Sequence, residues 1–197
     1  MLIQYLIKQS RKPSGLVGRL ITNIWSSYFK ELSLWAIKQT TIPNNSRILE
    51  IGYGGGSTIK NLLALDKDLD IHGIDISEES YHTARRIHSE AIENGSVKLR
   101  IGNVANLPYQ NSDFDLVFAI QTHIFWDDLK QSFQEIYRVM SNPSTLIIAS
   151  EKEKIKYHMT DYGKSHELRQ LLTSIGFSKI EEKQNYKWVV YVVTKSD

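Results

Sequence analysis

The sequence contains no cysteine among its 197 residues. This excludes disulfide bonds, zinc sites built from thiolates and covalent catalysis by a cysteine. Long apolar runs are also missing. The apolar segment at residues 1–7 ends at Lys8, far too early for a membrane span or for the apolar part of a signal sequence. We therefore expect a cytoplasmic protein without a membrane span.

Neither sign of charge is in large excess, because the net charge is only +2. A charge this small does not indicate a nucleic-acid partner, so none is expected. The first 46 residues are nevertheless basic, and Glu31 is their only acidic residue. We interpret this region as a solvated basic face rather than as a surface that steers an anionic substrate.

The bulk composition is that of one globular unit, with 41% apolar and 23% charged residues. No internal repeat, low-complexity stretch or linker divides the chain. Apolar residues recur with helical spacing over residues 19–39, ahead of the first expected strand. We therefore expect an N-terminal helical extension or cap over residues 1–45, followed by a binding domain over residues 46–197.

A glycine-rich stretch organises the chain. The apolar run at residues 48–51 predicts a short buried strand, and Gly52, Gly54, Gly55 and Gly56 then leave the following turn almost free of side chains. Ser57 and Thr58 follow as possible caps of a helix. A strand, a bare turn and a helix N-terminus form a nucleotide-sized cleft in open α/β sheets.

The spacing in this stretch argues against a dinucleotide. The dinucleotide fingerprint needs a glycine at position 57, where this chain has Ser57. Glu50, two residues before the first glycine, would also repel a pyrophosphate at short range. A ligand that carries an ammonium group would be attracted by the same carboxylate.

A second carboxylate is expected beside the turn. Residues 71–76 predict a strand, and Asp75 stands at its C-terminal end. A carboxylate in this place accepts hydrogen bonds from ribose hydroxyls. Capping of the next helix is the alternative role, but Ser77 is better placed for it.

The rest of the chain continues the alternation of strands and helices. The expected strands, helices and connecting segments beyond residue 76 are a helix at 78–94, strands at 97–101, 112–120 and 145–150, a helix from 127 to 139, an irregular charged loop at 151–162, a helix at 165–175, and two final strands at 177–186 and 187–195.

The motif Glu50-x-Gly52-x-Gly54-x-Gly56 resembles the first motif of class I S-adenosylmethionine (SAM) dependent methyltransferases. Residues 135–144 resemble the turn that precedes the fifth strand of that family, although its glycines are missing. The resemblance implies an α/β, Rossmann-like, seven-stranded and mostly parallel sheet with helices on both faces and a C-terminal antiparallel hairpin. It also implies SAM as the cofactor and, as in the broad methyltransferase type 11 group, a small-molecule acceptor.

The resemblance further implies that residues at the strand ends bind this cofactor: Glu50, Gly52, Gly54, Gly56, Asp75, Ile76, Asn103, Val104 and Gln121. Within this set, Glu50 would hold the ammonium group, Asp75 the ribose, and Asn103 the adenine amino group. The family usually has an acid at the place of Asn103. Gln121 would lie near the methionine end of the cofactor.

His123 follows the fourth expected strand at the same sheet edge, and it is our candidate for a general base. A packing role at the start of a helix is the alternative, and it stays open. No metal site is predicted.

Other functions were compared with methyl transfer. A nicotinamide oxidoreductase is disfavoured by the glycine spacing and by Glu50. Methylation of nucleic-acid amino groups is disfavoured because residues 119–122 lack the Asn/Asp-Pro-Pro-aromatic motif. A SAM-binding module without catalysis stays open, as does the choice of O, N or C as the methylated atom.

Overall fold

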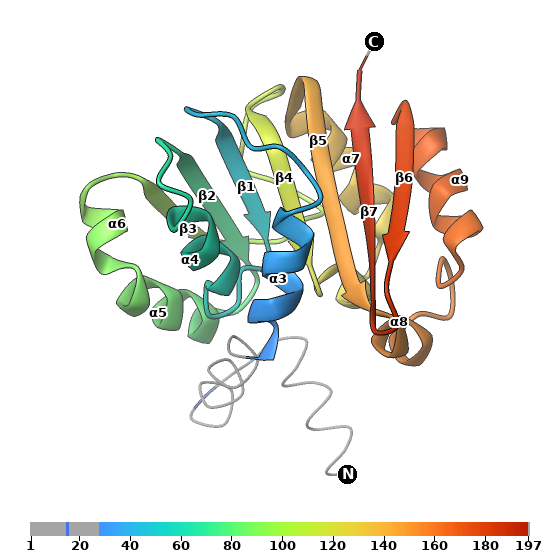
Figure 1. The fold of residues 1–197 in the computed structure, drawn as a ribbon, viewed down its shortest axis with the longest axis horizontal. Helices are drawn as coiled ribbons and strands as arrows, with labels where there is room; N and C mark the ends of the chain where they lie inside the picture. Colours follow the sequence, from blue (N-terminus) through green and yellow to red (C-terminus); the bar gives the residue numbers. More distant parts are fainter. Residues whose placement is uncertain (1–14, 16–27, 197) are drawn as a thin grey trace.

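The computed structural model describes residue 15 and residues 28–196. Seven strands form one twisted sheet in the order β3-β2-β1-β4-β5-β7-β6 (Figure 1). The sheet confirms the predicted α/β fold. The strands are β1 (Arg47–Ile51), β2 (Asp70–Asp75), β3 (Val97–Ile101), β4 (Phe114–Ile120), β5 (Met140–Glu151), β6 (Lys179–Gln184) and β7 (Trp188–Lys195).

The central strands run parallel, and only β7 opposes its neighbours. Strand β1 pairs in parallel with both β2 and β4, and Glu50 lies opposite Gly73 on one side and Phe118 on the other. Strand β7 pairs antiparallel with β5 and β6, which is the predicted C-terminal hairpin. The carboxyl ends of β1, β2, β4 and β5 therefore meet at one edge of the sheet.

Helices cover both faces. One face packs against α3 (Lys30–Ile37), α4 (Ser57–Leu63) and α5 (Glu78–Ile87), whose inner residues include Leu32, Ile59 and Ala84. The other face packs against α7 (Leu129–Val139), α8 (Lys152–His158) and α9 (Ser165–Ile175). The short helix α6 (Ser89–Glu93) follows α5, and the 3-10 helix η1 (His123–Phe125) follows β4.

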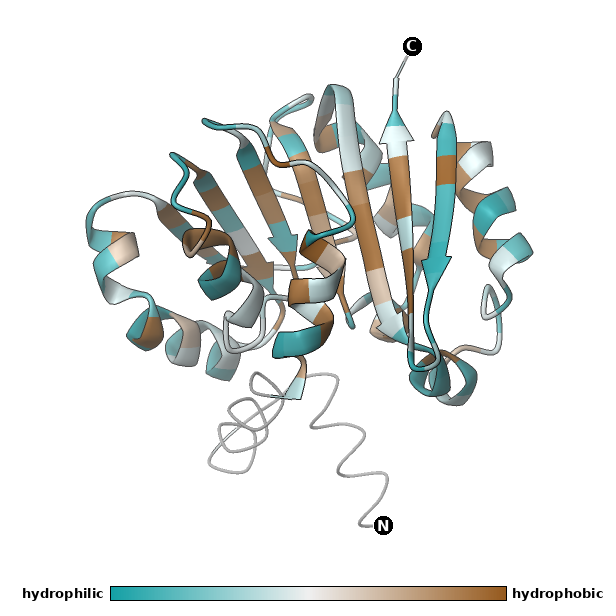
Figure 2. Cartoon of the chain, viewed as in Figure 1, coloured by the Kyte–Doolittle hydropathy of each residue, from teal (hydrophilic) through white to brown (hydrophobic). Residues whose placement is uncertain are grey.

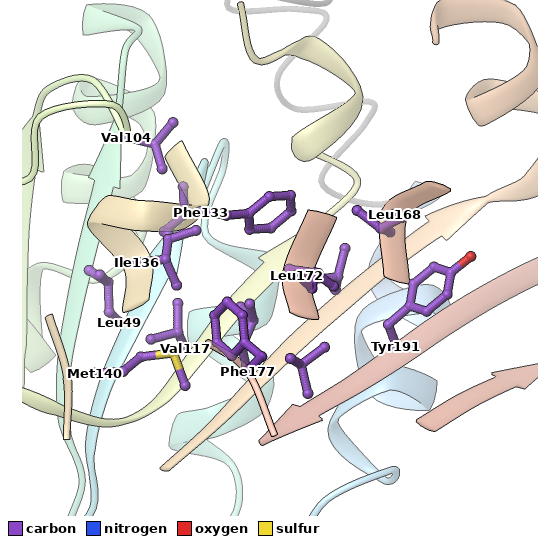
Figure 3. Close-up of a cluster of buried hydrophobic side chains, with 14 of the residues drawn as sticks. Leu49, Val104, Val117, Phe133, Ile136, Met140, Leu168, Leu172, Phe177 and Tyr191 are labelled. Atoms are coloured by element: carbon purple, nitrogen blue, oxygen red, sulfur yellow. The ribbon is translucent and has the colours of Figure 1, made fainter. Parts of the chain in front are cut away.

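The core is apolar on both sides of the sheet. Figure 2 shows hydrophobic residues concentrated in the central strands, whereas the edge strand β6 is mostly hydrophilic. Figure 3 shows the cluster beneath α7 and α9, in which Phe133 and Ile136 meet Leu172 and Phe177 over the sheet. Burying apolar side chains on both faces is what stabilises a parallel sheet of this kind.

Two boundaries differ from the sequence-based prediction, each because of a contact between segments that are distant in the sequence. The expected helix over residues 78–94 is broken at His88 into α5 and α6, and the buried His88 ring contacts the Gly56 carbonyl. The expected turn at residues 141–144 lies within β5. The register shifts there, since Phe114 pairs with Met140 and Leu116 with Thr145, so the extra residues bulge from the strand.

Two further expectations were wrong. Residues 152–158 form α8 instead of an irregular loop, and only Ile155 in this charged segment is buried, so its apolar signal is weak. Ser57 and Thr58 do not cap α4. Its N-cap is Gly56 in the left-handed conformation, without a side-chain capping bond.

Much of the predicted N-terminal cap lies outside the described residues. Of the helix predicted over residues 19–39, the structure describes α3. Across residues 28–196, no helix has both the length and the apolar character that crossing a membrane requires.

We expect the cluster beneath α7 to dominate stability. Phe133 is fully buried, so Phe133→Ala should lower the free energy of unfolding by about 3–5 kcal/mol, because it leaves a cavity. Tyr186→Ala is the control: Tyr186 is 94% exposed, and its loss should change stability by less than about 0.5 kcal/mol. Denaturant unfolding measures both values. Equal losses in the two variants would contradict this assignment of the core.

Candidate functional site

The turn after β1 can be formed only by glycine at two of its positions. Gly52 and Gly56 have φ of +71° and +79°, in the left-handed region. A Cβ on Gly52 would stand 2.2 Å from Thr122 Oγ1, and one on Gly56 would stand 2.4 Å from His88 Nε2. By contrast, a Cβ on Gly54 would meet no atom within 4 Å, so space is open beside the turn.

Asp75 ties this turn to the end of β2. Its Oδ2 accepts a hydrogen bond from the Gly54 N–H at 2.8 Å, and its Oδ1 accepts one from the Ser77 N–H at 2.9 Å. Burial raises the pKa of Asp75, and these bonds oppose that rise. Ser77 caps α5, as predicted, by accepting from the Ser80 N–H. The Ser80 hydroxyl and the Ile76 N–H also stabilise the ionised form of Asp75, so a ligand would share this carboxylate with donors from the protein.

Glu50 is buried at the end of β1 with 2% of its surface exposed. Desolvation is the main cause that raises its pKa from 4.5 to about 8, and the negative charge of Asp75 adds to the rise. The Thr58 hydroxyl and the Ile59 N–H oppose it. Among the described residues, nothing forms a hydrogen bond with Glu50 Oε2. A buried acceptor without a donor is costly unless a ligand supplies one.

Gln121 presents the complementary group at the end of β4. Its Oε1 accepts a hydrogen bond from the Glu151 N–H at 2.8 Å, which fixes the side-chain amide against the end of β5. Its Nε2 is buried and has no partner within the part of the chain that the structure describes. The adjoining ends of β1 and β4 thus carry a buried acceptor and a buried donor that the protein itself does not satisfy.

The remaining predicted contacts follow β2 and β3. Ile76 is 42% exposed, whereas Val104 is 7% exposed and packs in the core. Asn103 is exposed, and its Oδ1 accepts from the Ala105 N–H at 2.9 Å, which closes a local turn. One acceptor position of Asn103 is therefore already used by the backbone.

His123 begins η1 and is almost fully buried. Burial lowers its pKa from 6.5 to about 4, so the ring is neutral at pH 7. Its Nδ1 lies 3.4 Å from Ser150 Oγ on β5. The structure therefore gives His123 both a buried position and a neutral ring at the sheet edge that carries the turn.

Sequence reasoning missed His88. Its Nε2 lies 2.9 Å from the Gly56 carbonyl oxygen, and it breaks α5 from α6 at the point where it reaches the turn. Burial lowers its pKa, so a neutral ring donates this bond. No spacing rule connects position 88 with position 56, so only the folded chain reveals the contact. Across residues 28–196 no cluster of three or more potential ligand residues has the arrangement of a metal site.

Comparison with known proteins identifies relatives by sequence. A family model for a methyltransferase domain matches residues 48–142. The uncharacterized methyltransferase YdaC of Bacillus subtilis is 31% identical over 109 residues, which cover 55% of this chain and 58% of YdaC. The O-methyltransferase resE of Aspergillus sclerotiorum is 26% identical over 147 residues, which cover 68% of this chain and 55% of resE. The matched region spans little more than half the length of these relatives.

Solved structures share the fold at lower identity. A putative SAM-dependent methyltransferase from Methanococcus maripaludis has a TM-score of 0.73 and 20% identity, covering 91% of this chain and 94% of that one. The [4+2]-cyclase SpnF has a TM-score of 0.71 and 17% identity, covering 85% of this chain and 80% of that one. Likenesses at this level of identity establish the architecture alone.

The contact between Gly52 and Thr122 yields a prediction that backbone strain alone does not make. Gly52→Ala should cost about 1 kcal/mol for its left-handed backbone and about 1–3 kcal/mol more for the clash with Thr122. Gly95→Ala is the matched control, because Gly95 has φ of +85° and no atom within 4 Å of its added Cβ. Denaturant unfolding of both variants checks the difference, and equal losses would show that no close contact constrains Gly52.

Proposed function

Because the chain belongs to the class I SAM-dependent methyltransferases, we propose that it transfers a methyl group from SAM to a nucleophilic O, N or C atom of a small molecule. The observation that carries the proposal is the pair of buried, unsatisfied atoms at the strand ends, Glu50 Oε2 and Gln121 Nε2. An acceptor and a donor of this kind fit the ammonium and the carboxylate of the methionine part of SAM.

The other predicted contacts fit the nucleoside part of SAM. The open backbone at Gly54 leaves room beside the turn, and Asp75 is held against this backbone by the hydrogen bond from the Gly54 N–H. We assign ribose binding to Asp75, with Ile76 beside it, and adenine binding to Asn103 and Val104. SAM supplies an activated methyl group when it is bound.

The contribution of this chain is mainly positional. Buried donors and acceptors, held by strand ends, fix a ligand without reorganising during the reaction. The proposal also includes the division of the chain into a cap over residues 1–45 and a binding domain over residues 46–197. In its support, the Tyr28 hydroxyl donates to Glu151 Oε1 at 3.1 Å, which connects the cap segment to the strand end that Gln121 holds.

A SAM-binding module without methyl transfer is the second candidate. It is favoured by His123, whose pKa of about 4 makes it a weak base, and by the occurrence of this fold in a protein named as a cyclase. Conversion of SAM to S-adenosylhomocysteine in the presence of a cell extract separates the two. No conversion by a chain that binds SAM would favour the module.

Calorimetric titration with SAM tests the site directly. We expect Asp75→Asn to weaken SAM binding at least about tenfold, because a neutral amide replaces charge-assisted hydrogen bonds to the ribose. Asp68→Asn is the control, since Asp68 is exposed. Unchanged affinity in Asp75→Asn would remove Asp75 from the site, and a wild-type chain that does not bind SAM would overturn the proposed function.

The raised pKa of Glu50 predicts proton release on binding. At pH 7 most Glu50 side chains are protonated in the free protein, because their pKa is about 8. An ammonium group beside the carboxyl favours its ionised form, so SAM should displace up to about one proton per site. Its affinity should therefore rise with pH up to about 8 and then level off.

Titrations in two buffers of different ionisation enthalpy count the released protons. Wild type should give different heats in the two buffers, and Glu50→Gln should give equal heats because it has no proton to release. Equal heats for wild type, or unequal heats that persist in Glu50→Gln, would contradict the assignment of the ammonium to Glu50.

A further inference from the structure

A pocket of about 320 Å³ lies beside the segment that follows β4. We call it the η1–α8 pocket, because it lies between the segment from η1 to the start of α7 and the end of α8 with the loop after it. The lining residues are His123, Ile124, Trp126, Asp127, Asp128, Leu129, Lys130, His158, Met159, Thr160, Asp161 and Tyr162. The first segment follows β4 and the second follows β5, so both leave the same edge of the sheet.

One side chain connects this pocket with the glycine turn. Thr122 Oγ1 accepts a hydrogen bond from Trp126 Nε1 at 3.3 Å, and it stands where a Cβ of Gly52 would be. Thr122 therefore packs against the turn and also contacts Trp126, which lines the pocket. A molecule in the pocket would lie next to a ligand on the turn.

Four rings line the pocket, beside the apolar side chains of Ile124, Leu129 and Met159; the rings belong to His123, Trp126, His158 and Tyr162. The rings of His123 and Trp126 meet edge to face at 6.3 Å, and Phe125 meets His158 in the same way at 4.9 Å. Burial lowers the pKa of both histidines, and Lys154 contributes at His158. Flat faces favour a flat ring. The volume is at the lower end of ligand pockets, so the pocket admits only a small molecule.

The rim is acidic. Asp127, Asp128 and Asp161 are exposed at the pocket, and Lys130 is the basic residue that lines it. Asp128 also caps α7 by accepting from the Gln131 N–H at 2.9 Å, so its place is fixed. With the histidines neutral, carboxylates outnumber ammonium groups, and an anionic guest is repelled.

We propose that the η1–α8 pocket holds the methyl acceptor and that this acceptor is a small aromatic or heteroaromatic amine, not a carboxylate or a phenolate. The inference rests on the proposed function. The proposed function leaves O, N and C open as the methylated atom. The walls and the rim of the pocket, not the cofactor site, are the reason for choosing nitrogen.

The chemistry of transfer agrees with this choice. The nitrogen lone pair forms the new N–C bond while the C–S bond breaks, and the electron pair of that bond stays on sulfur. Positive charge thus moves from sulfur to nitrogen, and the acidic rim stabilises it. The same rim opposes formation of the phenolate that O-methylation requires.

His123 is suited to receive the proton that nitrogen then loses. Nδ1 faces Ser150, and within the described chain Nε2 forms no hydrogen bond. The neutral tautomer with its proton on Nδ1 leaves the Nε2 lone pair for the acceptor. A base with a pKa of about 4 matches the acidic cation of a methylated aromatic amine, but it is far too weak for a phenol, whose pKa is near 10.

Three probes of one shape test the charge preference: 4-nitroaniline, 4-nitrophenol and 4-nitrobenzoate, at pH about 8.5, where the phenol is ionised. Equilibrium dialysis with absorbance detection measures their binding to the full chain, with and without S-adenosylhomocysteine. We expect the aniline to bind at least about tenfold more tightly than either anion. An anion that binds as tightly as the aniline would overturn the inference.

Paired variants connect the preference to the pocket. Asp161→Asn should narrow the ratio of aniline to benzoate affinity about threefold, because one rim charge is lost. Asp68→Asn, equally a loss of one exposed carboxylate but not in the pocket lining, should leave the ratio unchanged. Equal effects of the two variants would show that the preference does not arise in the pocket.

The titrations with SAM keep this inference separate from the proposed function. A chain that binds SAM but prefers the anions retains the function and refutes the amine. A chain that prefers the aniline but binds no SAM refutes the function.

Discussion

The hydrogen bond from the Gly54 N–H to Asp75 is the contact on which the candidate site depends. It joins the turn after β1 to the end of the neighbouring strand β2. The side chain at the end of the second strand therefore fixes the backbone of the turn that follows the first. His88 reinforces the union from the end of α5 by contacting the Gly56 carbonyl. The turn is therefore held by two side chains from the next unit, while Gly54 leaves space open beside it.

This arrangement explains why burial at the site is tolerated. Glu50, Asp75 and Gln121 are all nearly inaccessible to solvent, and burial disfavours the charged form of both acids. Asp75 is compensated by backbone N–H groups, whereas Glu50 is compensated only in part. A partly satisfied polar cluster in a core is destabilising. Its presence at the carboxyl ends of parallel strands, where open α/β sheets bind ligands, is consistent with completion by a ligand.

The sequence predicted the fold well because local patterns determine most of it. Apolar runs located the central strands, and β1 with its glycine turn placed Glu50 and Asp75 at one edge. Errors arose where a distant contact overrides a local pattern. His88 breaks a helix whose sequence looks continuous, and the register shift opposite Phe114 draws the expected turn into β5. Because the apolar signal of α8 is weak, the sequence did not predict this helix, whose last residue, His158, lines the η1–α8 pocket.

The site itself was only partly predictable, for a physical reason. The sequence indicates which residues follow a strand. It does not indicate which of their donors and acceptors remain without a hydrogen-bond partner in the folded protein. The Asn103 oxygen was expected to be open to a ligand and instead accepts from Ala105, whereas the donor left over on Gln121 appears only once the Glu151 N–H is seen to occupy its oxygen.

The two edges of the sheet differ in how completely their polar and charged groups are paired. At the amino-terminal edge, Arg47 bonds Asp113 at 2.7 Å and Asp70 at 3.2 Å, and Lys98 bonds Asp70 at 2.6 Å. The charges of this edge satisfy one another and stabilise the fold. At the carboxyl-terminal edge, burial is deeper and the pairing is incomplete, because Glu50 has no basic partner among the described residues. Arg47 thus pairs with Asp70 and Asp113 where the strands begin, whereas the buried Glu50 Oε2 at the end of β1 is left without a donor among the described residues.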